Sequence, residues 1–280
     1  MALNGGLVAA QIGFGLAAGS MALLADAVHN LGDVLGLVLA WAALVLGRRA
    51  PTAARTYGWG RFSILAALAN AMILLISIGA IGLEAVQRLL APAPIQATMV
   101  AWVAWMGLLV NGATAALFMR GHDDLNIRSA FVHMASDAVL SAGVLLAALV
   151  VGRTGILWID PAASLAIVGV IGAGTWGLLR DSVTLAMDAV PPGVDQAAIS
   201  TWLRALPGVA EVHDLHVWAL STTQNAVTVH LVQTEAGPAE ALTKAACAGL
   251  RERFKIGHAT IQVETPHLAA LCLLRPAEVV

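Results

Sequence analysis

Two copies of one spacing, His-x-x-x-Asp, lie inside long apolar segments of this chain. The pairs are His29 with Asp33 and His133 with Asp137. Because four residues make about one helical turn, each pair is expected on one face of its helix. An ionisable side chain at bilayer depth costs about 2.5–3.5 kcal/mol on insertion scales. Two such pairs therefore indicate a compensating cation, because two imidazoles and two carboxylates offer four ligands for a divalent metal.

The composition indicates an integral membrane protein. Of the 280 residues, 59% are hydrophobic and 11% are charged, whereas soluble domains carry about 25% charged residues. The formal net charge is -2, and nothing in the charge pattern points to nucleic acid as a partner. The two cysteines, Cys247 and Cys272, have no CxxC partner, so neither is predicted to belong to a zinc thiolate site.

Apolar runs of about 20 residues predict six membrane-spanning helices. They cover residues 3–24, 26–47, 62–84, 97–119, 128–151 and 157–180, with a tight turn near Leu24–Asp26. The ends and loops on one side carry Arg48, Arg49, Arg55, Arg61, Arg120, Arg128 and Arg180, against Arg88 and Arg153 on the other. By the positive-inside rule, this asymmetry places both termini in the cytoplasm.

The chain becomes more polar after the last predicted span. We expect a transmembrane domain over 1–180, a small cytoplasmic domain over 181–266 and a tail over 267–280. Within the small domain the patterns predict helices over 194–206 and 238–254, and strands over 209–220, 225–233 and 259–265. This helix–strand–strand–helix–strand order suits a small α+β sandwich.

Asp26 shares the helical stripe of His29 and Asp33, at spacings of three and four residues. Two interpretations of Asp26 stay open: it caps the N-terminus of the second span, or it lines an exit vestibule. A lone intramembrane histidine is most often a hydrogen-bonded packing residue. The repeated His/Asp pair instead favours transport of a metal or of protons.

Several segments resemble the cation diffusion facilitator family, the proton-coupled exporters of zinc, cadmium and cobalt. SMALLADAVHNLGDVLGLVLAWAA is similar to the second-helix signature of that family, and SAFVHMASDAVLSAGV is similar to its fifth helix. PGVAEVHDLHVWAL followed by TVHLV resembles its cytoplasmic domain. The resemblance covers nearly the whole chain, and it implies six transmembrane helices, a ferredoxin-like cytoplasmic domain and a homodimer in the lipid bilayer.

The resemblance also implies a transport site, which maps onto His29, Asp33, His133 and Asp137. This His₂Asp₂ set resembles the zinc-preferring branch of the family, and tetrahedral nitrogen and oxygen ligands suit Zn²⁺, with Cd²⁺ or Co²⁺ also fitting. Export of Fe²⁺, Co²⁺ or Ni²⁺ is the main alternative. An intramembrane metalloenzyme and a metal sensor without transport are weaker interpretations, because there is no HExxH motif and four ligands close the coordination shell.

Zinc binding requires neutral imidazole and ionised carboxylate, so protons compete with the metal for the same atoms. We therefore expect antiport with protons as the counter-ion, and His29 and His133 are the best proton carriers because imidazole titrates near neutral pH. The composition, rich in Ala, Gly and Arg and poor in Lys and Tyr, suggests a bacterial inner membrane.

Further residues are assigned from the resemblance. His213 and His230 occupy positions that bind metal in some family members, and His258 and Glu264 are candidates near them for a regulatory zinc site. Strand alternation predicts that His213 and His216 point to opposite faces. Arg61 and Asp188 fall where the resemblance implies an inter-subunit charge pair.

Overall fold

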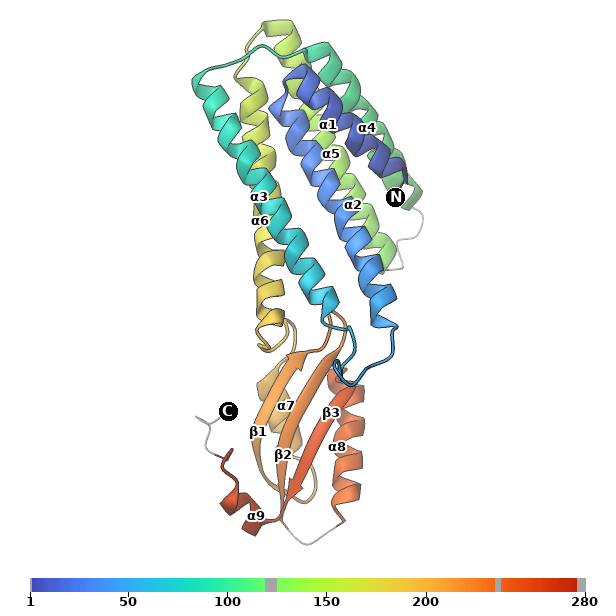
Figure 1. Cartoon of the computed structure of the whole chain (residues 1–280), viewed down its shortest axis with the longest axis vertical. Helices are drawn as coiled ribbons and strands as arrows, with labels where there is room; N and C mark the ends of the chain where they lie inside the picture. The colour runs from blue at the N-terminus through green and yellow to red at the C-terminus, as the bar shows by residue number, and fades with distance from the viewer. Residues whose placement is uncertain (1, 119–124, 235–237, 276–280) are drawn as a thin grey trace. The chain divides into compact units, whose positions relative to one another are not determined.

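The first part of the chain is a set of six helices (Figure 1). The computed structural model describes residues 2–118, 125–234 and 238–275. The helices are α1 (Ala2–Ala18), α2 (Met21–Gly47), α3 (Phe62–Leu90), α4 (Ala97–Phe118), α5 (Leu125–Thr154) and α6 (Ile159–Ala186). Of these, α2 to α6 are long and apolar enough to cross a membrane. Helix α1 has 17 residues, at the lower limit for a span, and it is not among those five.

The turn between the first two helices differs from the prediction. Helix α1 ends at Ala18 and α2 begins at Met21, so the turn predicted near Leu24–Asp26 is wrong. Gly19 makes the turn with φ of 68°, a left-handed conformation that glycine adopts without steric cost. The Ser20 hydroxyl accepts a hydrogen bond from the Leu23 amide at 3.1 Å and caps α2. Asp26 therefore lies within α2, and the interpretation of Asp26 as the N-cap is wrong.

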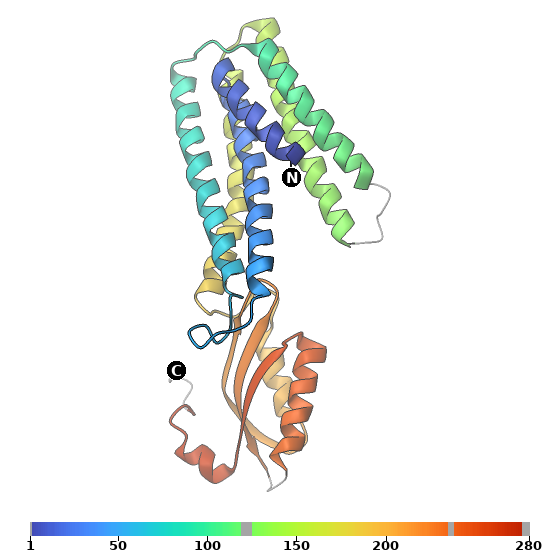
Figure 2. The same cartoon turned by 45° about the vertical axis from the view of Figure 1, so that its right-hand side comes forward.

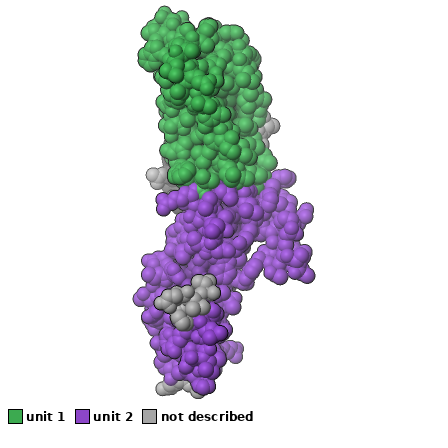
Figure 3. Space-filling model, turned by 60° about the vertical axis from the view of Figure 1, so that its left-hand side comes forward, with its two compact units in different colours: residues 1–39, 69–179 green, residues 40–68, 180–280 purple. Residues whose placement is uncertain are grey.

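The chain divides into two compact units, residues 1–39 with 69–179 and residues 40–68 with 180–280 (Figure 3). The core of the first unit takes side chains from all six helices: Ala18, Ala22, Leu23, Ala25, Ile78, Val100, Ala104, Val144, Ala148, Ile167 and Ile171. Small residues let helices approach closely where lipid supplies no hydrophobic driving force. A Cβ added to Gly32 would lie 2.4 Å from Leu74 Cδ2, so this glycine lets α3 approach α2 beside Asp33.

Helices α4 and α5 form an antiparallel pair, and they lie side by side in both cartoon views (Figures 1 and 2). Helix α1 also contacts α4. Since α5 carries His133 and Asp137, and α2 carries His29 and Asp33, both predicted pairs belong to the first unit.

The second unit contains a three-stranded sheet. Its elements are α7 (Gln196–Arg204), β1 (Val209–Ala219), β2 (Asn225–Gln233), α8 (Ala239–Phe254), β3 (His258–Glu264) and α9 (Pro266–Leu271). Strand β2 is central, antiparallel to β1 and parallel to β3. The predicted order of helices and strands is confirmed. A ferredoxin-like β-α-β-β-α-β order needs a further strand before α7, and the described residues 187–195 form none.

The small domain is held together by one apolar cluster between the sheet and its two helices. Ile199 and Leu203 of α7 and Leu250 of α8 pack with Val217 and Leu231 of the sheet. The secondary structure does not break at the two predicted domain limits, residues 180 and 266. Helix α6 continues through residue 180 to Ala186. Part of the predicted tail forms α9, in which Ala269 is 2% exposed. Residues 276–280 lie outside the described residues.

The first turn of α2 is tied to α6 by a buried carboxylate. Asp160 of α6 accepts a hydrogen bond from the Met21 amide at 2.7 Å and another from the Ser20 hydroxyl. Asp160 is 2% exposed and Ser20 is fully buried. The contact therefore satisfies an amide at the start of α2 that has no partner within its own helix.

Replacing Asp160 by alanine should destabilise this unit, because the Ser20 hydroxyl and the Met21 amide lose their acceptor inside the protein. We expect a loss of about 1–3 kcal/mol, seen as a lower midpoint of thermal unfolding of the purified protein in detergent. The control is Asp181→Ala, which removes an exposed carboxylate from the same helix and should leave the midpoint unchanged. Equal losses in the two variants would contradict the role given to Asp160.

Candidate metal sites

The structure brings the two His/Asp pairs of α2 and α5 together; we call His29, Asp33, His133 and Asp137 the membrane cluster. His29 Nε2 lies 3.1 Å from Asp137 Oδ1 and 4.0 Å from Asp33 Oδ2. His133 Nε2 lies 3.6 Å from Asp33 Oδ2 and 3.7 Å from Asp137 Oδ2. The two imidazole rings are 6.4 Å apart between centroids, at an interplanar angle of 74°. Each histidine therefore contacts the aspartate of the other helix as well as its own.

These distances suit a small cation. Ligands about 2.0–2.2 Å from a tetrahedral zinc ion lie roughly 3.3–3.6 Å from one another, close to most of the separations in the cluster. Ligand atoms of His29, Asp33 and Asp137 all fall within 4.8 Å of one another. His133 lies at the edge, with 46% of its side chain exposed, whereas Asp137 is 2% exposed. A small movement of the His133 side chain would close a four-ligand shell.

A buried polar network lies one helical turn from the membrane cluster. Gln11 of α1 donates to Asp26 Oδ2 at 2.7 Å, and Ser141 of α5 donates to the same oxygen at 3.1 Å. Asn30 donates to Gln11 Oε1 at 3.0 Å. Gln11, Asp26 and Ser141 are fully buried. Because Asn30 follows His29 and Ser141 lies one turn beyond Asp137, the network links α1, α2 and α5 next to the ligands. The signal in the sequence was Gln11, a polar residue within an apolar helix.

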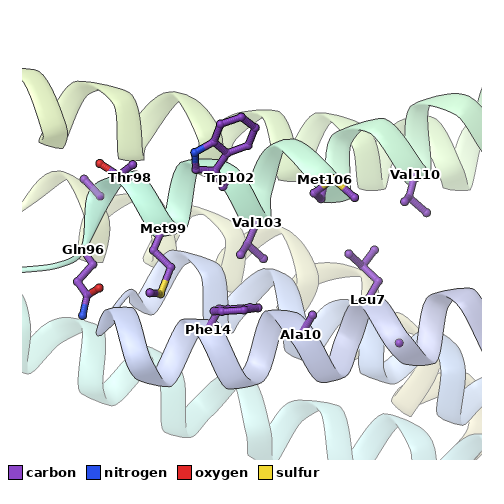
Figure 4. Close-up of a pocket in the computed structure, with 12 residues that line it drawn as sticks. Leu7, Ala10, Phe14, Gln96, Thr98, Met99, Trp102, Val103, Met106 and Val110 are labelled. Atoms are coloured by element: carbon purple, nitrogen blue, oxygen red, sulfur yellow. The ribbon is translucent and has the colours of Figure 1, made fainter.

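An apolar groove of about 960 Å³ lies between α1 and α4, away from these charges. Figure 4 shows Leu7 and Phe14 of α1 beside Met99, Val103 and Met106 of α4. Its lining is apolar except for Gln96 and Thr98. The groove therefore suits hydrocarbon rather than a metal ion.

A second group of possible ligands lies in the small domain; we call His213, His230, Glu264 and Cys272 the C-terminal cluster. Their ligand atoms all lie within 4.8 Å of one another. His230 Nδ1 is 3.1 Å from Glu264 Oε1 and 3.6 Å from Cys272 Sγ. His213 Nε2 is 3.3 Å from Glu264 Oε2. The cluster forms because His213 pairs with His230 across the sheet, and Glu264 pairs with Val232 two residues further along β2.

The donor atoms of the C-terminal cluster fit a metal. Both ring nitrogens of His213, and Glu264 Oε2, are buried and form no hydrogen bond with the described residues. A buried polar atom that makes no hydrogen bond costs about 1–3 kcal/mol, and a cation shared by these atoms would offset that cost. Two imidazoles, a carboxylate and a thiol are all ligands that zinc accepts.

One of the four residues predicted for this site is not part of it. His258 begins β3 at its far end, six residues from Glu264 and therefore about 20 Å away. There it pairs with Ala226, and its ring packs on Tyr57 at 5.4 Å between centroids. Cys272 Sγ instead lies with the ligand atoms of the three strand residues, although no CxxC spacing predicts a cysteine there. No sequence motif surrounds Cys272, because the packing of α9, and not the local sequence, brings this residue to the sheet.

A β-bulge alters the face of a neighbouring histidine. His213 pairs with His230, but His216 pairs with Thr228, only two residues along β2. Asp214 and Leu215 therefore lie opposite a single residue of β2, which defines the bulge, and Asp214 has a φ of 49°. His213 and His216 therefore share one face, and the predicted alternation is wrong at this point. Asp214 contacts both His216 Nε2 at 2.8 Å and His230 Nε2 at 3.4 Å.

An ion pair lies beside the C-terminal cluster. The Arg275 guanidinium donates to both carboxylate oxygens of Glu211, at 3.1 and 2.7 Å. These hydrogen bonds hold the pKa of Glu211 below its usual range. Glu211 Oε1 is in turn 3.8 Å from His213 Nδ1. The segment after α9 is therefore attached to β1 by charge next to the four possible ligands.

Two successive parts of the chain match one protein family. Residues 1–185 match the cation efflux transmembrane domain, and residues 191–266 match the cytoplasmic domain of cation efflux proteins. The chain belongs to the cation diffusion facilitator family. Members of this family are divalent metal efflux proteins, so this facilitator is a transporter and not an enzyme.

Relatives of this facilitator are similar over nearly its full length. CzcD, a metal cation efflux system protein of Cupriavidus metallidurans, is 35% identical over 94% of this chain and 84% of that protein. The zinc transporter ZitB of Escherichia coli is 34% identical over the same shares. A cadmium, cobalt and zinc/H(+)-K(+) antiporter of Bacillus subtilis is 33% identical over 94% of this chain and 86% of that one. A solved metal-bound C-terminal domain of CzcD from Cupriavidus metallidurans is 39% identical over 25% of this chain and 99% of that one, with a TM-score of 0.24.

In this facilitator, Arg61 and Asp188 are paired within one chain. The Nη2 group of Arg61 donates a hydrogen bond to Asp188 Oδ1. Each side chain is about half exposed. The resemblance had implied a charge pair between subunits. The structure forms the pair without a second subunit, because the residues after α6 and before α3 lie in the same compact unit.

The hydrogen bond between Gln11 and Asp26 should appear as coupling between two mutations. Gln11→Leu and Asp26→Leu each leave a buried partner unsatisfied, whereas the double variant removes both groups. We expect a coupling energy of about 0.5–3 kcal/mol in a double-mutant cycle measured by unfolding in detergent. A cycle that pairs Gln11→Leu with Asp160→Ala, in a different contact, should be additive. Additivity in both cycles would contradict the network.

Proposed function

We propose that this facilitator exports zinc from the cytoplasm in exchange for protons, and that His29, Asp33, His133 and Asp137 bind the ion in transit. One observation carries the proposal. Two imidazoles and two carboxylates from α2 and α5 meet with contacts of 3.1–4.0 Å among apolar helices. A cation shared by the four groups compensates the two carboxylates.

The donor set favours Zn²⁺, with Cd²⁺ and Co²⁺ as further substrates. Two nitrogen and two oxygen ligands suit these ions better than an all-oxygen set, which would favour Mg²⁺ or Mn²⁺. The relatives support this choice, since they are named for zinc, or for cadmium, cobalt and zinc. Export of Fe²⁺ or Ni²⁺ is the alternative, and parallel flux measurements with each ion decide between them.

Proton coupling follows from competition at the ligand atoms. Facing the cytoplasm, His29 and His133 lose their protons and the cluster takes a metal ion. Facing outward, protons return to the same atoms and the ion leaves. The partial exposure of His133 supports exchange with solvent, because 46% of its side chain is accessible. The Bacillus subtilis relative, which is named as a cadmium, cobalt and zinc/H(+)-K(+) antiporter, supports the proton part of this scheme.

The proposed arrangement in the membrane has six spans. Helix α1 supplies the first, and the arginine asymmetry places both termini in the cytoplasm. The transmembrane domain covers 1–180, the cytoplasmic domain 181–266 and the tail 267–280. We assign the cytoplasmic domain to the ferredoxin-like class on its helix–strand–strand–helix–strand order, although the described residues lack the first strand of that fold. We also propose that the protein is a homodimer in a bacterial inner membrane. The bacterial relatives support this location.

A second, regulatory zinc site is proposed in the cytoplasmic domain, with His213, His230 and Glu264 as ligands. Support comes from the buried ring nitrogens of His213 and the buried Glu264 Oε2, which have no hydrogen-bond partner among the described residues. Strands β1, β2 and β3 each supply one of the three ligands. The three ligands are therefore held by the sheet, and the occupancy of the site would follow the cytoplasmic concentration of the ion.

Zinc flux into proteoliposomes tests the transport function. Asp137→Ala removes a buried carboxylate that contacts both histidines, and we expect its flux to fall to that of protein-free vesicles. Asp181→Ala, which removes an exposed carboxylate, should keep the wild-type flux. Collapsing the imposed pH gradient should stop net accumulation by the wild type. Flux in Asp137→Ala equal to that of wild type would contradict the site, and flux indifferent to the gradient would contradict proton coupling.

The pH dependence of zinc binding gives a further prediction. Imidazole titrates near pH 6.5 in model peptides, and its protonated form does not bind zinc, so lowering the pH must weaken binding. From pH 7.5 to 5.5 the affinity of the membrane cluster should fall at least about tenfold. Calorimetry on His213→Ala/His230→Ala, which lacks the ligands proposed in the cytoplasmic domain, isolates this site. An affinity that rises toward acid pH would overturn the ligand assignment.

A further inference from the structure

The segment after the last strand reaches back to the sheet. Thr265 caps α9, its side chain accepting from the Leu268 amide at 3.2 Å, and Pro266 starts the helix. Helix α9 contacts β2 and β3 and buries Ala269. Cys272 follows immediately, and its Sγ lies 3.6 Å from His230 Nδ1. A thiol from outside the helix–strand–strand–helix–strand pattern is thereby placed among the three candidate ligands of the sheet.

The three strand residues leave a position open for a fourth donor. The side chains of His213 and Glu264 are 5% and 0% exposed, and three of their polar atoms have no hydrogen-bond partner among the described residues. A zinc ion bound by two imidazoles and one carboxylate needs one more ligand to complete a tetrahedron. Cys272 Sγ belongs to the group whose ligand atoms lie within 4.8 Å of one another.

We propose that Cys272 is the fourth ligand of the C-terminal cluster, so that a thiophilic divalent ion such as Zn²⁺ or Cd²⁺ fastens the segment 266–275 to the sheet. This inference rests on the regulatory site proposed above and names its remaining ligand. On binding, the thiol releases its proton to solvent and the thiolate sulfur coordinates the ion. Magnesium and manganese, which prefer oxygen ligands, are disfavoured by the same sulfur.

The coupling runs in both directions. Occupancy of the site by metal holds α9 against β2 and β3, and docking of α9 supplies the sulfur that raises metal affinity. The Arg275–Glu211 ion pair attaches the same segment beside the cluster, so the thiol is close to its partners before metal arrives. The cytoplasmic domain thus converts metal concentration into order in its C-terminal segment.

Cobalt absorption tests the ligand in the full-length protein in detergent. A thiolate bound to Co²⁺ gives charge-transfer absorption in the near ultraviolet, and the membrane cluster contains no cysteine to contribute to it. Wild type should show the band, and Zn²⁺ should abolish it by displacement. Cys272→Ser should lack the band, whereas the matched variant Cys247→Ser, which changes the other cysteine, should keep it. No band in wild type, or a band that survives in Cys272→Ser, overturns the proposal.

Two further measurements separate this proposal from those on which it rests. Zinc should slow hydrogen exchange over residues 266–275 in wild type but not in Cys272→Ser, and zinc affinity at this site should fall at least about tenfold in that variant. Unchanged affinity in Cys272→Ser, together with lost binding in His213→Ala, would reject the thiolate and keep the three-ligand site. Unchanged binding in both variants would reject the regulatory site itself. Proteoliposome flux in Asp137→Ala tests transport independently of either outcome.

Discussion

Charged side chains among apolar helices need partners, and this constraint organises the first unit. Among the residues that the structure describes, neither Asp33 nor Asp137 has a lysine or arginine contact; each lies against the two histidines. Imidazole is a modest partner, because it is charged only when protonated. A group of two carboxylates and two imidazoles therefore accepts either protons or a divalent cation, and the exchange of one for the other is the chemistry that a proton-coupled exporter requires.

The remaining buried polar groups of that unit hold the helices that carry the ligands. Asp26 joins α2 to α1 through Gln11 and to α5 through Ser141. Asp160 joins α6 to the start of α2. In an apolar environment such hydrogen bonds are costly to leave unmade, so they select one arrangement of helices that weak packing alone would not. Gly32 also favours this arrangement, because the absence of a side chain there leaves room for Leu74 of α3.

The two clusters are built on different principles. The membrane cluster repeats one local spacing on two helices, so each half of it is visible as a motif. The C-terminal cluster takes one residue from each of three strands and one from the segment after α9. Its stronger burial, with Glu264 fully covered and His213 nearly so, suits an ion that stays. The more exposed His133 suits an ion that passes.

The sequence alone determined what depends on local spacing and composition. The apolar runs predicted the helices α2 to α6, the order of elements in the small domain was correct, and the i, i+4 pairs identified the four residues that α2 and α5 bring together. Positions near turns were less well predicted, because Gly19 and Ser20 end one helix and start the next five residues before the predicted turn.

Only the tertiary structure decided what depends on pairing between distant segments. Register across the sheet placed Glu264 beside His213 and His230 and left His258 at the opposite end of β3. The bulge near Asp214 turned His216 to the face of His213. The packing of α9 brought Cys272 to the C-terminal cluster, where no cysteine motif predicts it. Strand register, a bulge and a docked helix are set by contacts between distant residues, and a linear pattern does not contain that information.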